Sequence, residues 1–272
     1  MIWRTTRKLL CLIGCFCCAS ALAQSPDHAR EKRWADEVTP GLVVGDAITL
    51  SQANGHRFLA LHTANTRARA GVIVVHGMGV HPDWNLIGVL RTGLAEGGYA
   101  TLSIQMPVLA ADAKGELYPA LFTDAAKRLQ AAVTWLRDQR HRKIAIVSHS
   151  MGARMVNHFL VNGGASEIDA WAAVGISTGE FLQAQSFKVP LLDIYGERDF
   201  PAVLKLAAQR AAAIKHIRGS GQIQVAGADH YFNGTEAELT RRIKLFLDQV
   251  RSEEHTSELQ SHLNLVCRLL LE

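Results

Sequence analysis

Short apolar runs alternate with segments of helical periodicity over most of this chain, and this alternation restricts the fold more than any other feature of the sequence. The apolar runs, which read as strands buried on both faces, are residues 71–75, 99–104, 143–147, 170–175, 189–194 and 222–225. Helices are expected at residues 84–96, 123–137, 151–160, 201–214 and 236–250. Strands that alternate with helices form a mostly parallel sheet with helices on both faces. The sequence therefore predicts an α/β fold.

A hairpin is expected in front of this alternating region. Residues 42–50 and 56–62 are β-like runs around Asn54-Gly55, a dipeptide favoured in tight hairpin turns. The polar and charged residues 24–41 before it are expected to form a loosely held leader. The hairpin and the alternating region together give one domain over residues 42–250, which is the usual size of a single large α/β domain.

The N-terminus has the composition of a secretory signal peptide. Basic side chains between residues 4 and 8 precede an apolar run at residues 9–19, and Ala21-Leu22-Ala23 offers the small-residue pattern of a cleavage site. The apolar run is too short for a permanent membrane-spanning helix. We expect residues 1–23 to be removed and the protein to be exported, either to the periplasm or out of the cell, with no stable membrane span.

The cysteines lie outside the expected domain. Cys11, Cys15, Cys17 and Cys18 are in the signal segment, and Cys267 is near the C-terminus. A domain without cysteine excludes disulfides, thiolate metal sites and a cysteine nucleophile. As an alternative to cleavage after Ala23, Leu12-Ile13-Gly14-Cys15 resembles a lipobox, which would anchor the protein as a lipoprotein through Cys15.

The sequence of the C-terminal segment does not resemble that of a natural protein terminus. Residues 251–262 and 265–272 look like a translated sequencing-library adapter, with residues 263–264 in its variable index. We expect residues 251–272 to be an assembly artefact and the natural C-terminal sequence to be missing.

The charge argues against a nucleic-acid-binding protein. The formal net charge of +4 is spread along the chain, with no basic stripe of the kind that binds nucleic acid. A small molecule is the expected partner, and the sequence leaves the oligomeric state open.

The segment Ser148-His149-Ser150-Met151-Gly152 lies between an expected strand and an expected helix. This is the context of a nucleophile elbow, the sharp turn that lifts a serine above a sheet. Most such elbows have glycine two residues before the nucleophile, where this chain has Ser148. A helix N-cap is the alternative role for Ser150.

A carboxylate and a histidine follow later strands. Asp199 follows the strand at residues 189–194, and His230 follows the last strand, before the closing helix. Histidine is the natural general base near neutral pH, and a carboxylate can orient it. Asp193 and Glu197 are the rival carboxylates. His149 is the rival base, but its position beside Ser150 favours a packing or supporting role.

The segment His76-Gly77-Met78-Gly79 follows the strand at residues 71–75. Its glycines allow the backbone to present the N–H of Met78 to an oxyanion, together with the N–H of Met151. The long loop at residues 105–121 is expected to overhang the same edge of the sheet, because functional loops follow the C-terminal ends of parallel strands.

These motifs resemble the α/β-hydrolase superfamily over residues 42–250. The signal segment and His81-Pro82-Asp83-Trp84 resemble more narrowly the secreted bacterial α/β-hydrolase-like proteins of the DUF3530 type. The resemblance implies a sheet of about eight strands above which Ser150, Asp199 and His230 meet. It implies no organic cofactor and no metal.

The resulting functional prediction is a serine hydrolase. It would cleave an ester-type acyl bond through a Ser-His-Asp triad and an acyl-enzyme, and a carboxylic ester is the favoured substrate. Thioesters, amides and peptides remain open. The alternative from another class is a non-catalytic envelope protein that binds or scaffolds on a hydrolase fold, suggested by Ser148 at the usual glycine position.

Overall fold

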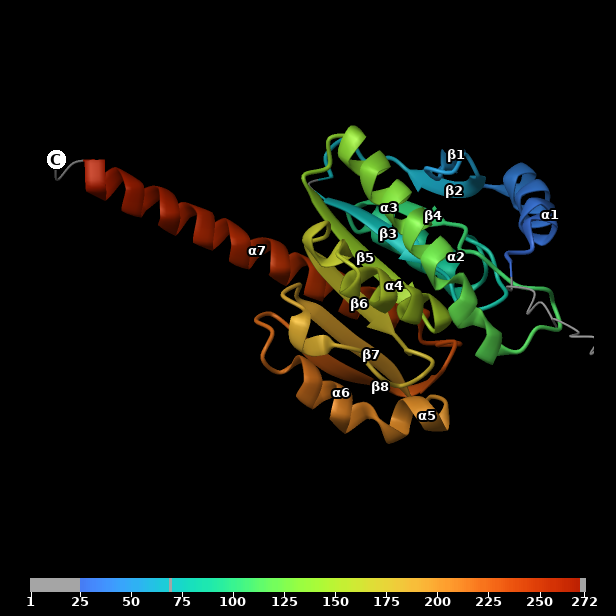
Figure 1. The fold of residues 1–272 in the computed structure, drawn as a ribbon. Coiled ribbons are helices and arrows are strands. Elements are labelled where there is room, and N and C mark those ends of the chain that lie inside the picture. The colour runs from blue at the N-terminus through green and yellow to red at the C-terminus, as the bar shows by residue number, and fades with distance from the viewer. Residues whose placement is uncertain (1–24, 69, 270–272) are drawn as a thin grey trace, which may run out of the picture.

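The computed structural model describes residues 25–68 and 70–269, and beyond Ser252 it describes only the backbone of the last helix. In this part of the chain eight strands form one sheet, in the order β1-β2-β4-β3-β5-β6-β7-β8 (Figure 1). The strands are β1 (Asp46–Ser51), β2 (Arg57–Thr63), β3 (Ala70–Val75), β4 (Ala100–Ile104), β5 (Lys143–His149), β6 (Ala170–Val174), β7 (Leu191–Arg198) and β8 (Gly221–Asp229). β2 pairs antiparallel with β1 and β4, and the other pairs are parallel. The predicted mostly parallel sheet is confirmed.

Helices cover both faces of the sheet. On one face lie α3 (Phe122–Asp138) and α4 (Met151–Val161), and on the other lie α2 (Leu86–Glu96) and the first part of α7 (Glu236–Leu269). The residues of β3 alternate between the two hydrophobic clusters: Ile73 and Val75 belong to the first, and Val72 and Val74 to the second. A strand that is buried on both sides needs no polar alternation, which explains the continuous apolar runs in the sequence.

The expectation of a loosely held leader is wrong. Residues His28–Val38 form a helix, α1, which is capped by the Asp27 carboxylate. Glu31 on this helix is only 6% exposed, and its two carboxylate oxygens accept hydrogen bonds of 3.0 and 3.1 Å from the Arg128 guanidinium on α3. The partner lies 97 residues further along the chain, so the polar composition of the leader gave no sign of this buried ion pair.

The expected helix over residues 201–214 is two helices, α5 (Pro201–Lys205) and α6 (Ala207–Ile214). The buried Arg210 side chain donates a hydrogen bond of 2.7 Å to the carbonyl of Val203. In a continuous helix that carbonyl would accept from the residue four positions later. The competing side-chain bond explains the break.

Helix α7 continues past its expected end at residue 250. It runs to Leu269 and projects away from the rest of the domain (Figure 1). Residues 251–269 contain neither glycine nor proline, so no local signal ends the helix. Val250, at 8% exposure, is the last buried side chain among those described. The assignment of residues 251–272 to a translated adapter stays a prediction.

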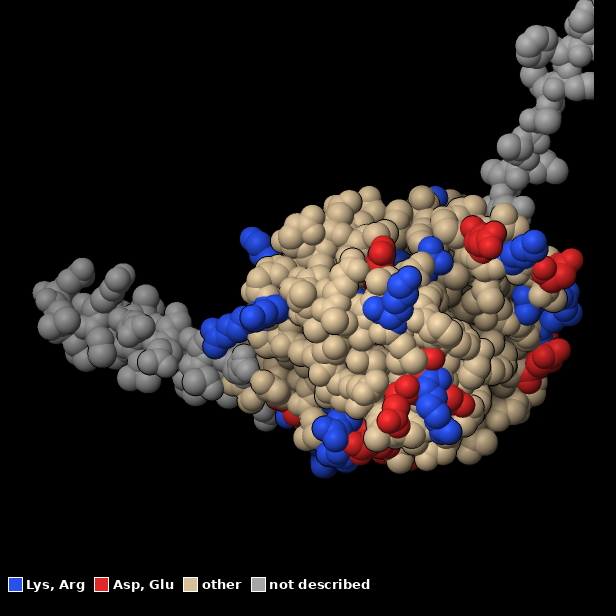
Figure 2. Space-filling model, turned by 90° about the horizontal axis from the view of Figure 1, so that it is seen from below, with Lys and Arg blue, Asp and Glu red and all other residues tan. Residues whose placement is uncertain are grey.

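Two observations concern the surface and the membrane. On the face seen in Figure 2, basic and acidic side chains are interspersed. Within residues 25–68 and 70–269, no helix has the length and hydrophobicity needed to cross a bilayer. The expected signal peptide at residues 1–23 lies outside the described residues.

Candidate active site

Ser150 lies in a strained turn between β5 and α4. Its φ of 56° is in the left-handed region, which non-glycine residues rarely adopt. The Ser150 N–H donates to the carbonyl of Val174 at 2.8 Å, which ties the turn to β6. A Cβ at Gly152 would collide with the carbonyl oxygen of His76. Position 152 therefore requires glycine, which lets the start of α4 pack against the end of β3 and hold the turn at Ser150.

Ser150, His230 and Asp199 form a continuous line of hydrogen bonds. His230 Nε2 lies 2.9 Å from Ser150 Oγ, and His230 Nδ1 lies 2.6 Å from Asp199 Oδ1. His230 directly follows β8 and Asp199 directly follows β7, as the sequence predicted. Gly175, at φ 53° after β6, packs against both side chains, where a Cβ would lie 3.1 Å from Asp199 Oδ2. The structure brings the three predicted side chains together.

The surroundings of Asp199 keep its carboxylate ionised. Burial alone would raise the pKa of this carboxyl, but hydrogen bonds from His230, the Phe200 N–H and the Gly196 N–H lower it below its ordinary value. An ionised Asp199 accepts the Nδ1–H of His230. In the neutral imidazole with its proton on Nδ1, Nε2 is the acceptor nitrogen and can take the Ser150 hydroxyl proton.

The rival residues have other partners. Asp193 is buried against Arg210 at 2.8 Å, and Glu197 accepts the N–H of Gly227. His149 Nε2 donates to the backbone carbonyl of His230 at 2.9 Å, so His149 supports the loop that carries His230, as its position in the sequence suggested.

Ser148, the departure from the usual elbow pattern, has a structural partner. Its hydroxyl accepts the indole N–H of Trp171 on β6 at 2.8 Å, and both side chains are buried. A glycine at this position would leave a buried N–H donor without a partner, at a cost of about 1–3 kcal/mol. The serine is therefore matched to its neighbour, which the sequence motif alone could not reveal.

The loop that carries Met78 is fixed from both sides. His76 is fully buried; its Nδ1–H donates to the carbonyl of Gly77 at 2.8 Å, and its Nε2 accepts the N–H of Met106 at 2.9 Å. Arg30 on α1 donates to the carbonyls of Gly79 at 3.0 Å and Leu109 at 2.9 Å. Sequence reasoning missed Arg30 because it lies in the segment taken for a leader.

Aromatic side chains lie beside the ring of His230. Phe200 stacks on the His230 ring at 3.9 Å and is 44% exposed, and Tyr231 is 40% exposed. The loop at residues 105–121 ends in a short 3-10 helix, η2 (Gly115–Leu121). A Cβ at Gly115 would lie 3.3 Å from the sulfur of Met78, so this loop does reach the edge where Ser150 lies. Phe200 was missed because one aromatic residue after an aspartate is not a recognisable signal.

Two buried neutral histidines are expected to make the protein acid-sensitive. Burial lowers the pKa of His76 to about 3 and that of His149 to about 4. Between about pH 6.5 and 4 these two histidines are therefore protonated in the unfolded chain and neutral in the folded chain. Each histidine then lowers the free energy of unfolding by up to about 1.4 kcal/mol per pH unit as the pH falls, and has no effect on it above pH 7.

Urea unfolding at pH 7.5, 6 and 5 measures this dependence of the free energy of unfolding on pH. His149→Ala should reduce the slope, and His216→Ala, at an exposed position, should leave it unchanged; an equal slope in all three proteins would contradict the assignment.

Comparisons with known proteins agree with this fold. Residues 9–120 match the model of a family described as a protein of unknown function, DUF3530. No curated protein matches the chain. Similar solved structures include Est1E from Butyrivibrio proteoclasticus, with a TM-score of 0.62, 15% identity, and coverage of 76% of this chain and 99% of that one.

Two further solved structures have the same architecture. An esterase from Pyrococcus furiosus has a TM-score of 0.60 and 18% identity, covering 75% of this chain and 92% of that one. An α/β serine hydrolase without a lid from Xanthomonas campestris has a TM-score of 0.61 and 15% identity, covering 76% and 95%. The chain has the α/β-hydrolase fold, and the predicted resemblance to α/β-hydrolase-like proteins of the DUF3530 type is confirmed.

Proposed function

We propose that this protein is a serine hydrolase that cleaves an ester-type acyl bond. The observation that carries the proposal is the line of two hydrogen bonds from Ser150 Oγ through His230 to the carboxylate of Asp199, at 2.9 and 2.6 Å. Each distance lies within the range needed for proton transfer or for orienting a base.

The chemistry follows from this order of groups. His230 Nε2 takes the hydroxyl proton as Ser150 Oγ attacks the carbonyl carbon, and Asp199 stabilises the imidazolium that forms. The imidazolium then gives the proton to the leaving group, so that the acyl group stays on Ser150 as an ester. A water molecule, deprotonated by the same histidine, attacks this acyl-enzyme and releases the acid.

The proposed oxyanion donors are the N–H groups of Met78 and Met151. Met151 is the first residue of α4, where backbone N–H groups have no partner within the helix and the helix dipole favours negative charge. A Cβ at Gly77 would lie 3.2 Å from Ser150 Cβ, so the loop that carries Met78 lies against the nucleophile. Both donors would therefore face charge that develops beside Ser150.

A carboxylic ester is the favoured substrate, with thioesters, amides and peptides as variants. The exposed apolar side chains of Met78, Phe200 and Tyr231 suit an uncharged acyl or aryl group. Among the structural neighbours, one is an esterase and another, Est1E, has been solved with ferulic acid bound.

The chain organisation that accompanies this function is also a proposal. We infer a signal peptide at residues 1–23, an exported hydrolase domain at residues 28–250, extended from the expected start at residue 42 to include α1, and an artefact at residues 251–272. The non-catalytic alternative gains no support from Ser148, since its hydroxyl is used by Trp171.

A chain-length series of p-nitrophenyl esters, run beside a panel of peptide substrates, tests the proposal. We expect hydrolysis of at least the short esters, at a higher kcat/KM than for any peptide of the panel. A protein with a cooperative melting transition and no hydrolysis above the Ser150→Ala background would contradict the function.

His149→Ala is expected to retain ester hydrolysis within about tenfold of the unchanged protein, whereas loss of the histidine of a Ser-His-Asp triad costs about 10⁵–10⁶-fold. The reason is that His149 bonds to the backbone of His230 and not to Ser150. Measurement of kcat and KM for His149→Ala checks this expectation, with melting curves to confirm that the variant folds. A folded His149→Ala protein that is as inactive as His230→Ala would overturn the choice of base.

A further inference from the structure

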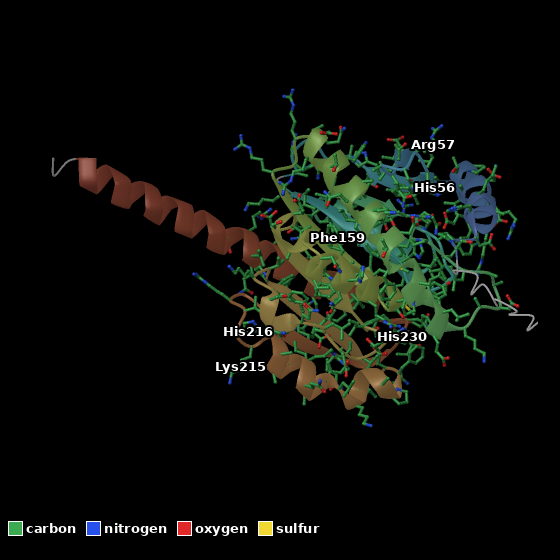
Figure 3. All side chains as sticks on the ribbon, in the orientation of Figure 1. His56, Arg57, Phe159, Lys215, His216 and His230 are labelled. Carbon is green, nitrogen blue, oxygen red and sulfur yellow. The ribbon has the colours of Figure 1, made fainter. Side chains whose placement is uncertain are left out.

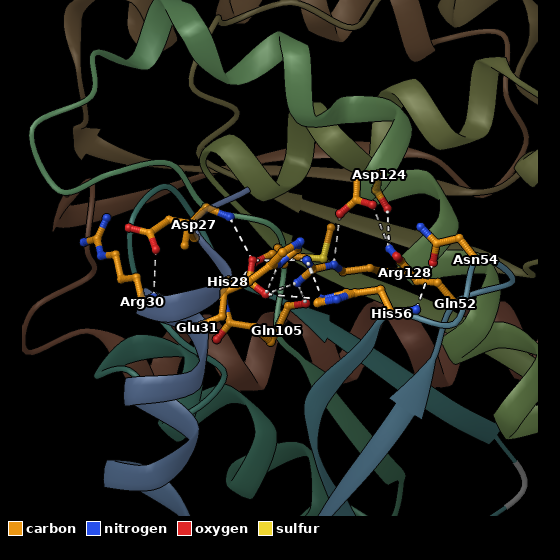
Figure 4. Close-up of polar contacts among 12 residues, drawn as sticks. Asp27, His28, Arg30, Glu31, Gln52, Asn54, His56, Gln105, Asp124 and Arg128 are labelled. Atoms are coloured by element: carbon orange, nitrogen blue, oxygen red, sulfur yellow. Dashed lines mark hydrogen bonds and ion pairs between the residues drawn. The ribbon is translucent and has the colours of Figure 1, made fainter. Parts of the chain in front are cut away.

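Three side chains converge outside the proposed active site, between α1 and the β1–β2 hairpin (Figure 4). His28 Nδ1 lies 3.5 Å from Glu31 Oε2, and His56 Nε2 lies 3.8 Å from the same oxygen. All three ligand atoms lie within 4.8 Å of one another. Neither histidine has a role in the proposed hydrolysis.

The fold explains why these groups meet. His28 and Glu31 are three residues apart on α1, so they share one face of the helix. His56 follows Gly55 in the hairpin turn, and its ring stacks on the ring of His28 at 3.9 Å. Helix α1 and the hairpin that follows it in the sequence therefore present two imidazoles to one carboxylate.

The donor set fits a transition metal of the zinc type. Two imidazole nitrogens and one carboxylate oxygen are typical ligands of Zn²⁺, which binds them at about 2.0–2.2 Å. Around a tetrahedral ion such atoms are about 3.3 Å apart. The two histidine–Glu31 separations of 3.5 and 3.8 Å need to close by a few tenths of an ångström, and the separation of the two imidazole nitrogens, which is within 4.8 Å, by up to about 1.5 Å.

The charges around the cluster include one cation that opposes a metal. Arg128 donates to both oxygens of Glu31 and lies within hydrogen-bond distance of His56 Nε2, at 3.5 Å, a contact that His56 gives up when the lone pair of that nitrogen binds a metal. Its guanidinium also pairs with Asp124 at 3.2 Å. Two carboxylates and one guanidinium leave a single negative charge at the cluster, and each carboxylate oxygen has a second lone pair to offer a metal. The arrangement thus remains attractive to a divalent cation.

Solvent and ions can reach the cluster. It borders an open groove of about 670 Å³ between α1 and the hairpin, which is also lined by Lys32, Asp36 and Arg57. Lys32 and Asp36 form an exposed ion pair with each other at 2.7 Å. The groove leaves room for a water molecule as a fourth ligand.

We propose that His28, Glu31 and His56 bind one divalent transition-metal ion of the zinc class. The ion links α1 to the β1–β2 hairpin. Helix α1 also carries Arg30, which donates hydrogen bonds to the carbonyls of Gly79 and Leu109. The metal link would therefore stabilise the helix that holds the loop beside Ser150.

Calorimetric titration of the whole signal-free chain, prepared without a polyhistidine tag, tests this proposal with ZnCl₂ as the probe. One ion per chain is expected, with a rise in melting temperature. His28→Ala and His56→Ala should each weaken the affinity by at least about tenfold. The matched control is His216→Ala, whose position lies across the molecule from His56 in Figure 3; it should bind as the unchanged protein does.

The histidine variants are preferred over a Glu31 variant, because loss of Glu31 breaks a buried ion pair and can unfold the protein. Melting curves without metal establish that the variants fold. Absence of binding to the intact chain, or an affinity in His28→Ala, His56→Ala and the double variant equal to that of the unchanged chain, overturns the proposal. The result is independent of hydrolysis, since the readouts are heat and melting temperature.

Discussion

Ser150→Ala and His230→Ala are each expected to lower kcat for an ester substrate by about 10⁵–10⁶-fold, and the double variant should cost little more than either alone. The two side chains share one proton across a distance of 2.9 Å. Either loss removes the same attack step, so the effects do not add. Initial rates with a p-nitrophenyl ester, measured with enough protein to detect the residual activity, provide the test.

Ser150→Gly supplies a control against misfolding. Because Ser150 is held at φ 56°, a glycine there should be equally inactive but relieve strain of about 1–3 kcal/mol. An inactive variant that melts at a higher temperature cannot owe its inactivity to unfolding. Full activity of a folded Ser150→Ala protein, or additive losses in the double variant, would contradict the shared step.

Asp199→Asn is expected to lower kcat by about 10³–10⁴-fold with little change in KM. If the amide oxygen of the substituted side chain accepts the Phe200 N–H, as Asp199 Oδ1 does, the negative charge that stabilises the imidazolium of His230 is lost. If the amide nitrogen faces His230 instead, Nδ1 becomes the acceptor and Nε2 carries the proton, so it cannot accept one from Ser150. Both orientations of the side chain therefore impair the same step.

The matched control for this substitution is Glu197→Gln. Glu197 was the exposed rival carboxylate, and it bonds to Gly227, so its loss should leave kcat within about twofold, as usual for a surface change. An Asp199→Asn protein with unchanged kcat, or a Glu197→Gln protein that is inactive while folded, would show that the wrong carboxylate was chosen.

The parts that the sequence predicted well depend on local patterns. The continuous apolar run of β3 and the Asn54-Gly55 turn indicated a buried strand and a hairpin, and both are present. Ser150, Asp199 and His230 each follow a strand, and topology alone brings the ends of parallel strands to one edge.

The parts that the sequence did not predict each depend on a single side-chain contact. Glu31 makes α1 part of the domain through Arg128, and Ser148 replaces the usual glycine because Trp171 needs an acceptor. The break before α6 depends on the side chain of Arg210. Such contacts leave no periodic signal, because each depends on a single pair of residues.

The central claim is that Ser150 is an activated nucleophile, and reaction with a fluorophosphonate probe followed by peptide mass spectrometry measures this most directly. The phosphorus of the probe bonds to an activated serine oxygen and fluoride leaves. We expect one adduct per chain, on Ser150, which is lost in Ser150→Ala and strongly slowed in His230→Ala. A folded protein that remains unlabelled, or one that carries the adduct on another residue, would contradict the account.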